Sequence, residues 1–157
     1  VTTRYSSQLP DLTGLSVSDV ATASTLTLAA DTLSIINYTG AAACAATLPA
    51  ATAGTIVGYV QSKDTTGGVA TLSFDCAGSD VYKTGSIIES RGSSEVTFDT
   101  SAASETLLTF TPANAATNLL TTGCKLYFVC YEKGTWTIAY DLSTETTQVT
   151  GAFVFAS

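Results

Sequence analysis

The sequence predicts an all-β protein, with an antiparallel β-sandwich or barrel-like domain at residues 23–157 behind an extended N-terminal arm at residues 1–22. Three observations support this fold class. Strand-length segments recur about every 8–14 residues, separated by loops rich in Gly, Ser and Asp. Thr is the commonest residue, with 29 copies, and its β-branched side chain suits a pleated surface. A chain of 157 residues is the size of one domain.

The arm differs from the rest of the chain because its apolar residues keep neither a helical nor a strand period for long. Pro10 favours an extended conformation at the residue before it. We expect this arm to dock on a neighbouring subunit, and a frayed terminus is the alternative. Its interface candidates are Arg4, Tyr5, Leu9, Leu12 and Leu15.

The β pattern begins after the arm. Thr25–Leu28 alternates strictly between polar and apolar residues, and Leu33–Tyr38 forms the next predicted strand. The Ala-rich stretch 41–53 favours a short helix by propensity. Pro49 and the lack of an amphipathic stripe argue against a long helix there. Ile56–Gln61 is the next predicted strand.

A Thr-Thr-Gly-Gly turn at residues 65–68 is expected to join Ile56–Gln61 to Val69–Asp75 in a hairpin, because glycine tolerates positive φ. Shorter strand candidates follow at nearly regular spacing. They are Val81–Tyr82, Ser86–Ile88, Glu95–Asp99 and Thr106–Thr111, and Gln148–Ala156 closes the chain.

The clearest signal is a β-hairpin over Lys125–Asp141 that turns at Glu132–Gly134. Both faces of its first strand are apolar. One face can pack on the protein's own core, and the other needs cover, for which a second copy of the chain is a natural source. Central strands of thick sandwiches show the same pattern, which is the alternative. The face that needs cover carries three more interface candidates, Tyr127, Val129 and Tyr131.

Composition excludes several classes of function. Six basic against thirteen acidic residues, a net charge of −7, argue against a nucleic-acid partner. No apolar run approaches the roughly 20 residues of a membrane span. The absence of His excludes catalytic triads and metal sites that use imidazole. We therefore expect no enzyme activity, no catalytic residues, no cofactor and no metal, and we treat carboxylate pairs such as Asp75 and Asp80 as chance neighbours.

The four cysteines lack any C-x-x-C pairing, which argues against a zinc site. Buried free thiols are the expectation, since free Cys behaves as a small hydrophobe. One disulfide, such as Cys44–Cys76, is the alternative. The full set is Cys44, Cys76, Cys124 and Cys130.

Two segments carry a resemblance. The first is ATLPAATAGTIV at 46–57, followed by AGSDVY at 77–82, and the second runs from LYFVC to GTWTI at 126–138. Over roughly residues 45–140, this order resembles a β-rich module of tailed-bacteriophage virion proteins, namely capsid decoration (cement) proteins and some head or tail fibre domains. Two positions depart from the pattern. Ser79–Val81 only approximates the usual loop, and Cys130 stands where a polar residue is common.

The resemblance implies a structural virion protein that decorates and stabilises the outer surface of a phage head. It implies a homotrimer bound to the major capsid protein, made in the cytoplasm of the bacterial host and located on the virion. The alternatives are a fibre module that binds host surface glycan and, more weakly, a secreted bacterial adhesin or carbohydrate-binding domain. Either would use a sugar-stacking platform, whereas core and interface packing is the plainer role for the same aromatic residues, Tyr127, Tyr131, Trp136 and Tyr140.

Overall fold

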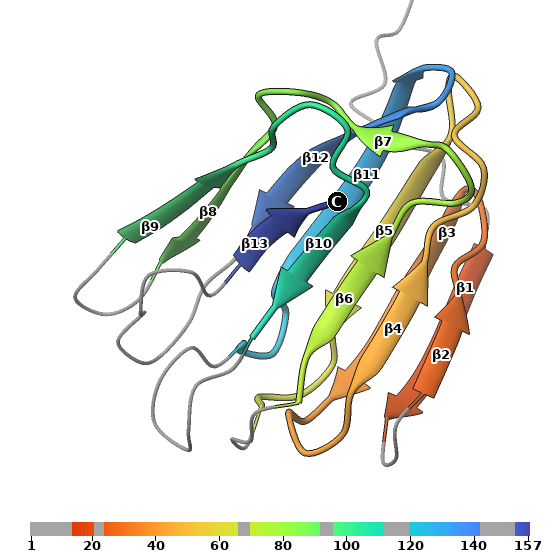
Figure 1. The fold of residues 1–157 in the computed structure, drawn as a ribbon. Helices are drawn as coiled ribbons and strands as arrows, with labels where there is room; N and C mark the ends of the chain where they lie inside the picture. Colours follow the sequence, from red (N-terminus) through yellow and green to blue (C-terminus); the bar gives the residue numbers. More distant parts are fainter. Residues whose placement is uncertain (1–13, 21–23, 66–69, 92–95, 112–119, 142–152) are drawn as a thin grey trace, which may run out of the picture.

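The computed structural model describes residues 14–20, 24–65, 70–91, 96–111, 120–141 and 153–157, which form an all-β protein (Figure 1). The all-β prediction is therefore confirmed. The strands of these residues are β1 (Gly14–Val20), β2 (Ser24–Thr27), β3 (Thr32–Tyr38), β4 (Cys44–Thr47), β5 (Ile56–Gln61), β6 (Leu72–Asp75), β7 (Val81–Tyr82), β8 (Ile87–Arg91), β9 (Val96–Thr100), β10 (Leu107–Phe110), β11 (Lys125–Glu132), β12 (Thr135–Asp141) and β13 (Phe153–Ala156).

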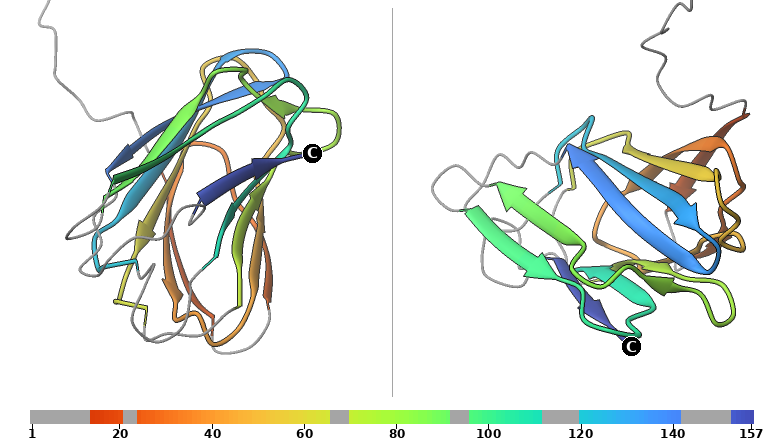
Figure 2. Two further views of the ribbon diagram at one scale, coloured as in Figure 1. Left: turned by 60° about the vertical axis from the view of Figure 1, so that its left-hand side comes forward. Right: turned by 90° about the horizontal axis from the view of Figure 1, so that it is seen from above.

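Two main sheets enclose the core. One has six strands in the order β1-β3-β5-β11-β12-β7, the other has five in the order β13-β10-β6-β4-β2, and β8 pairs only with β9. Figure 2 shows the two main sheets as two layers. Aromatic rings bridge these layers, because Phe74 of β6 contacts Tyr59 of β5 and Phe128 of β11, with ring centroids 5.1 and 5.0 Å apart. The core therefore lies between the two sheets.

The strand directions show that the antiparallel prediction is wrong, because both main sheets are mixed. β1, β3 and β5 are parallel neighbours in one sheet, and β2, β4 and β6 are parallel neighbours in the other. By contrast, β11 runs antiparallel to β5 and β12, and β10 runs antiparallel to β6 and β13. Up to β6 the chain changes sheet after every strand. Strands that are neighbours in space are then two apart in sequence and point the same way.

Two local predictions need correction and one is confirmed. The hairpin predicted across residues 65–68 is not formed, because β5 and β6 belong to different sheets. The Ala-rich stretch contains strand β4 rather than a helix, and its pairing with β2 and β6 overrides the helix propensity of alanine. The hairpin over Lys125–Asp141 is present as β11 and β12, with Gly134 of its turn at a φ of 82°.

The described part of the predicted arm, Gly14–Val20, is extended as expected, but it also belongs to a sheet. It is strand β1, which pairs in parallel with β3 at the sheet edge. A side chain at Gly14 would place its Cβ 2.5 Å from Oγ1 of Thr32, so any other residue there would have to displace the Thr32 side chain. The boundary predicted at residue 22 therefore falls between two strands of the fold.

One buried polar side chain fixes the position of β5 against β3. Gln61 is fully buried, and its Nε2 donates hydrogen bonds to the carbonyl oxygens of Tyr38 and Lys63, both at 2.6 Å. Its Oε1 accepts a hydrogen bond from the Tyr59 hydroxyl at 2.6 Å. Because these amide atoms have partners, Gln61 is held in the core without the penalty of an unmade hydrogen bond.

Candidate subunit interface

Strand β11 carries the predicted interface residues on one of its two sides. On the inner side, alternate side chains from Leu126 to Cys130 are fully buried. Tyr127 and Val129 are half-buried on the opposite side, and Tyr131 near the end of the strand is 74% exposed. The structure therefore places the three predicted residues outside the core between the sheets.

Strand β1 is exposed on both of its sides over residues 15–17. Leu15 and Val17 are 67% and 74% exposed. On the other side of the strand, the Ser16 hydroxyl donates a hydrogen bond of 3.0 Å to the hydroxyl of Ser34, which is buried. An ordinary edge strand places its apolar side chains toward the core and its polar ones toward water. In β1, the two large apolar side chains point away from the protein's own core.

The sheet register joins these residues into one surface, which we call the outer face: the side of the six-stranded sheet that points away from the five-stranded sheet. Leu33 of β3 is the register partner of Leu15. Ile35 lies between Val17 of β1 and Val60 of β5. The apolar members of the outer face are Leu15, Val17, Leu33, Ile35, Ile56, Val60, Tyr127 and Val129.

The sequence predictions covered this face only in part. Of the arm candidates, the structure places Leu15 on the outer face, and the others lie outside the described residues: Arg4, Tyr5, Leu9 and Leu12. Val17 is an apolar residue of the predicted arm that was not among the interface candidates, although its alternation with serine over Gly14–Val20 is a strand signal. The outer-face residues of β3 and β5 were also not predicted, although both strands have apolar residues on both sides, which is the signal that indicated β11.

Other predicted constellations do not assemble into sites. Trp136 is fully buried, so its ring cannot stack on a sugar. The carboxylate of Asp80 accepts a hydrogen bond from the backbone N–H of Ala51 at 2.7 Å, which is a role in holding a loop. Within the described ranges, no three His, Cys, Asp or Glu residues gather in an arrangement that could hold a metal ion.

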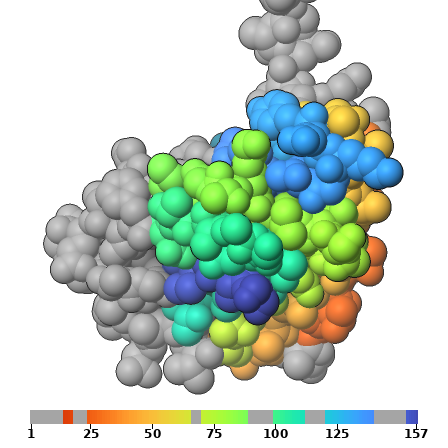
Figure 3. Space-filling view, turned by 45° about the horizontal axis from the view of Figure 1, so that its top comes forward, coloured from red at the N-terminus to blue at the C-terminus, as the bar shows by residue number. Residues whose placement is uncertain are grey.

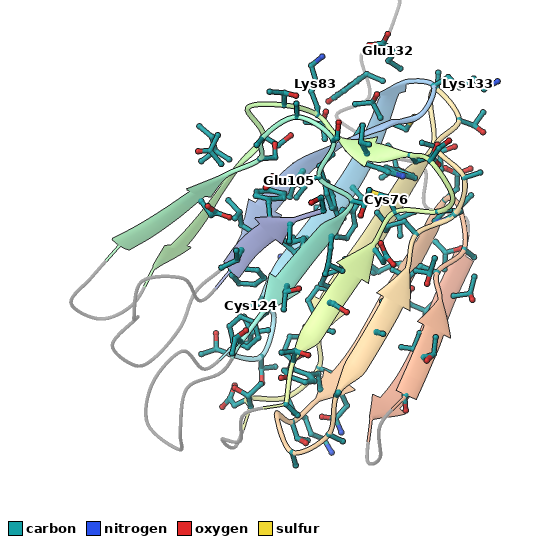
Figure 4. The ribbon with its side chains drawn as sticks, viewed as in Figure 1. Cys76, Lys83, Glu105, Cys124, Glu132 and Lys133 are labelled. Atoms are coloured by element: carbon teal, nitrogen blue, oxygen red, sulfur yellow. The ribbon has the colours of Figure 1, made fainter. Side chains whose placement is uncertain are left out.

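The four cysteines, all of them among the described residues, are buried thiols that form no disulfide. Burial raises the pKa of the Cys44 thiol to about 11. Burial, helped by the negative charge of Asp75, raises the pKa of Cys76 to about 12. The alternative of a Cys44–Cys76 disulfide is therefore not met in this structure, and the thiols pack as small apolar groups. Figure 4 shows Cys76 and Cys124 well apart in the fold.

Comparison of the chain with protein-family models, curated proteins and solved structures gave no match. The described part of the chain also contains no helix with the length and apolar character needed to cross a membrane. Any assignment of function therefore depends on the residues themselves, and above all on the outer face.

Proposed function

We propose that the chain is a non-catalytic structural protein of a tailed-phage virion, a capsid decoration protein of β-sandwich architecture that binds the outer surface of the head. The single observation that carries this proposal is the outer face. It presents apolar residues of β1, β3, β5 and β11 on one side of a sheet, in positions that a protein working alone would fill with polar residues.

Such a protein acts by binding alone. The chain assembles with copies of itself, a trimer being the form implied by the resemblance, and with the major capsid protein on the virion surface. The arm residues Arg4, Tyr5, Leu9 and Leu12 are our candidates for the contact with the shell. A net charge of −7 keeps the free protein soluble before assembly.

The competing glycan-binding functions receive less support. A fibre module or carbohydrate-binding domain needs aromatic rings open to the sugar. Of the predicted platform, Trp136 is fully buried and Tyr127 is half-buried, which leaves Tyr131 as the exposed ring among the described members. We therefore retain decoration as the proposal.

The experiment is quantitative mass spectrometry of purified virions, followed by binding of the full chain to heads that lack it. We expect a fixed ratio to the major capsid protein. Leu9→Asp with Leu12→Asp should weaken binding to heads at least about tenfold, because two apolar anchors contribute more than the roughly 1.4 kcal/mol that a factor of ten requires.

The matched control is Val154→Asp, which changes an exposed apolar residue on β13 of the other sheet and should leave binding unchanged. Absence of the chain from purified virions would overturn the proposed function. Equal loss of binding in the control would remove the arm from the proposal.

A further inference from the structure

We propose that strand β1 pairs along its open edge with β1 of a second copy of this chain, in antiparallel orientation about a two-fold axis. The six-stranded sheets of the two copies then form one continuous sheet. This inference goes beyond the proposed function, because it concerns how two copies join, whatever they bind together. It depends on the backbone hydrogen bonds of β1 and on a comparison of the sheet edges.

The register of β1 against β3 shows which backbone groups of β1 point to the open edge. Gly14 is the register partner of Thr32, and its N–H donates a hydrogen bond of 3.2 Å to the carbonyl oxygen of Asp31. In a parallel pair, every second residue bonds to the neighbouring strand, so the residues between them point away from it. On that other side the described part of the sheet ends. The residues whose N–H and C=O face the open edge are Leu15, Val17 and Asp19.

The other described sheet edges are less suited to accept a strand. β7 has two residues and β2 has four. At β13, the N–H of Phe155 donates a hydrogen bond of 2.6 Å to the carboxylate of Asp99, so this group already has a partner. Short strands and blocked groups are usual devices against pairing at an edge. β1 has seven residues in unbroken register, without proline, and one charged residue, Asp19.

The pattern of β1 fits a second β1 strand as the occupant of this edge. When two antiparallel copies meet with Val17 opposite Val17, Leu15 of each copy lies opposite Asp19 of the other. Residues opposite each other in such a hydrogen-bonded pair exchange both of their backbone bonds. Every N–H and C=O of these three residues then has a partner in both copies, and the new ladder lies entirely within β1.

Charge selects this register among the two-fold ones. The two chains each carry a net charge of −7, so their contact has to keep carboxylates apart. With Val17 at the centre, the two Asp19 residues are about 14 Å apart along the strands. A shift of the centre to Asp19 places the two aspartates directly opposite each other, where like charges are destabilising. A shift to Leu15 leaves the edge groups of Asp19 without partners in β1.

The side chains of β1 leave room for a neighbouring strand. Leu15 and Val17 are 67% and 74% exposed, and Ser16 on the other side is exposed as well. Cross-strand neighbours lie about 4.5–5.5 Å apart, so a second β1 covers part of Leu15 and Val17. The outer faces of the two copies also become one continuous apolar surface across the joined sheets.

A strand that pairs with itself about a two-fold axis has its edge filled by one partner. The expected unit in solution is therefore a dimer, and the trimer implied by the resemblance would require a further contact elsewhere on the chain. The arm candidates Arg4, Tyr5, Leu9 and Leu12 are not used in this contact. Self-association and binding to a shell are consequently separate properties, and a dimer that is absent from virions would remove only the decoration function.

The first test is disulfide cross-linking of the full chain under mild oxidation. Opposed residues of a hydrogen-bonded pair have Cα atoms about 5.5 Å apart, which suits a disulfide. Val17→Cys should therefore form a covalent dimer at least about ten times faster than Leu15→Cys, whose two copies lie about 14 Å apart along the strands. Leu15→Cys mixed with Asp19→Cys should cross-link as fast as Val17→Cys. The native cysteines are buried and do not compete.

The control for random collision is Val154→Cys, an exposed position on β13, which lies at the surface of the five-stranded sheet in Figure 3. Equal rates for Val17→Cys, Leu15→Cys and Val154→Cys would overturn the proposal. Faster self-linking of Leu15→Cys than of Val17→Cys would also overturn it, because the register would then be different.

The second test is the mass of the chain at about 100 μM, measured by sedimentation, which detects even weak dimers. We expect twice the 16.1 kDa of one chain. Val17→Pro should raise the dimer dissociation constant at least about tenfold, since it removes an N–H that faces the open edge and not β3.

The matched variant is Val17→Thr, which keeps the N–H and a β-branched side chain and should leave the dissociation constant unchanged within about twofold. Circular dichroism establishes that both variants are folded. A monomeric wild type, or equal effects of Val17→Pro and Val17→Thr, would show that the backbone of β1 does not join two copies.

Discussion

At the scale of single residues, the burial of the cysteine thiols predicts that they react slowly with thiol reagents. Thiol reagents attack the thiolate, and pKa values of about 11 for Cys44 and about 12 for Cys76 leave few thiolates near neutral pH. We expect the native chain to react slowly with a disulfide reagent at about pH 8, where on the order of one Cys44 thiol in a thousand is ionised. In guanidinium, all four cysteines should react. Rapid native labelling, or only two thiols after unfolding, would contradict the structure.

A second residue contributes stability that depends on pH. Oδ1 of Asp64 accepts hydrogen bonds from the backbone N–H and the hydroxyl of Thr122, at 2.6 and 2.8 Å, and these bonds lower the pKa of Asp64. A carboxyl whose pKa is lower in the folded state stabilises the fold above its unfolded pKa of about 3.9, and this contribution disappears as the pH falls through the folded pKa.

Asp64→Asn should therefore lower the melting temperature at neutral pH, and the difference from wild type should shrink as the pH falls below about 4. Thermal melts across this range provide the measurement. Thr122→Val removes the hydrogen bond of the hydroxyl and keeps that of the backbone N–H, so it should have a smaller effect at neutral pH. The double variant should lose less than the sum of the two, because both substitutions weaken the same contact. A pH-independent difference would show that the charge of Asp64 plays no part.

At the scale of elements, the two sides of β11 have different roles, because one side packs in the core and the other lies on the outer face. Phe128 is fully buried against Phe74 and Tyr82, whereas its neighbour Val129 lies half-buried on the outer face. Phe128→Ala should lower the free energy of unfolding by about 3–5 kcal/mol, the usual cost of emptying an aromatic core position. Val129→Ala should cost about 1 kcal/mol or less in the monomer. Chemical denaturation measures both, and equal costs would contradict the assignment of the two sides.

Strand positions were largely predictable from the sequence, but strand partners were not. Short apolar runs and alternation both indicate strands, so Ile56–Gln61 and Lys125–Asp141 were located almost exactly. Alternation does not encode the direction or identity of the neighbouring strand. Parallel pairs such as β3 with β5 and β4 with β6 were therefore not predicted. Strand β4 itself was also not predicted, because its alanines are compatible with a helix as well as with a strand.

At the scale of the whole molecule, the prediction of the candidate interface has the same limit: the sequence indicates strands, but it does not indicate which strands are neighbours. Tyr127, Val129 and Tyr131 could be named because one strand showed two apolar sides. The outer face as a whole required the register that brings Leu33 and Val60 into the same surface, and register is a property of the assembled sheet. The sequence alone therefore indicated one strand with two apolar sides, and the fold shows that this strand is part of a larger apolar surface.

The alternation of the early strands between two layers also sets an order for biosynthesis. The parallel neighbours of β1 to β6 all find their partners within residues 14–75, which leave the ribosome before residues 76–157. At that moment β5 and β6 are the growing edges of the two sheets, and they stay unpaired on one side until β10 and β11 are made. During the synthesis of roughly the next fifty residues, the nascent chain therefore presents two open edges side by side, and this is the interval in which a chaperone has most to shield.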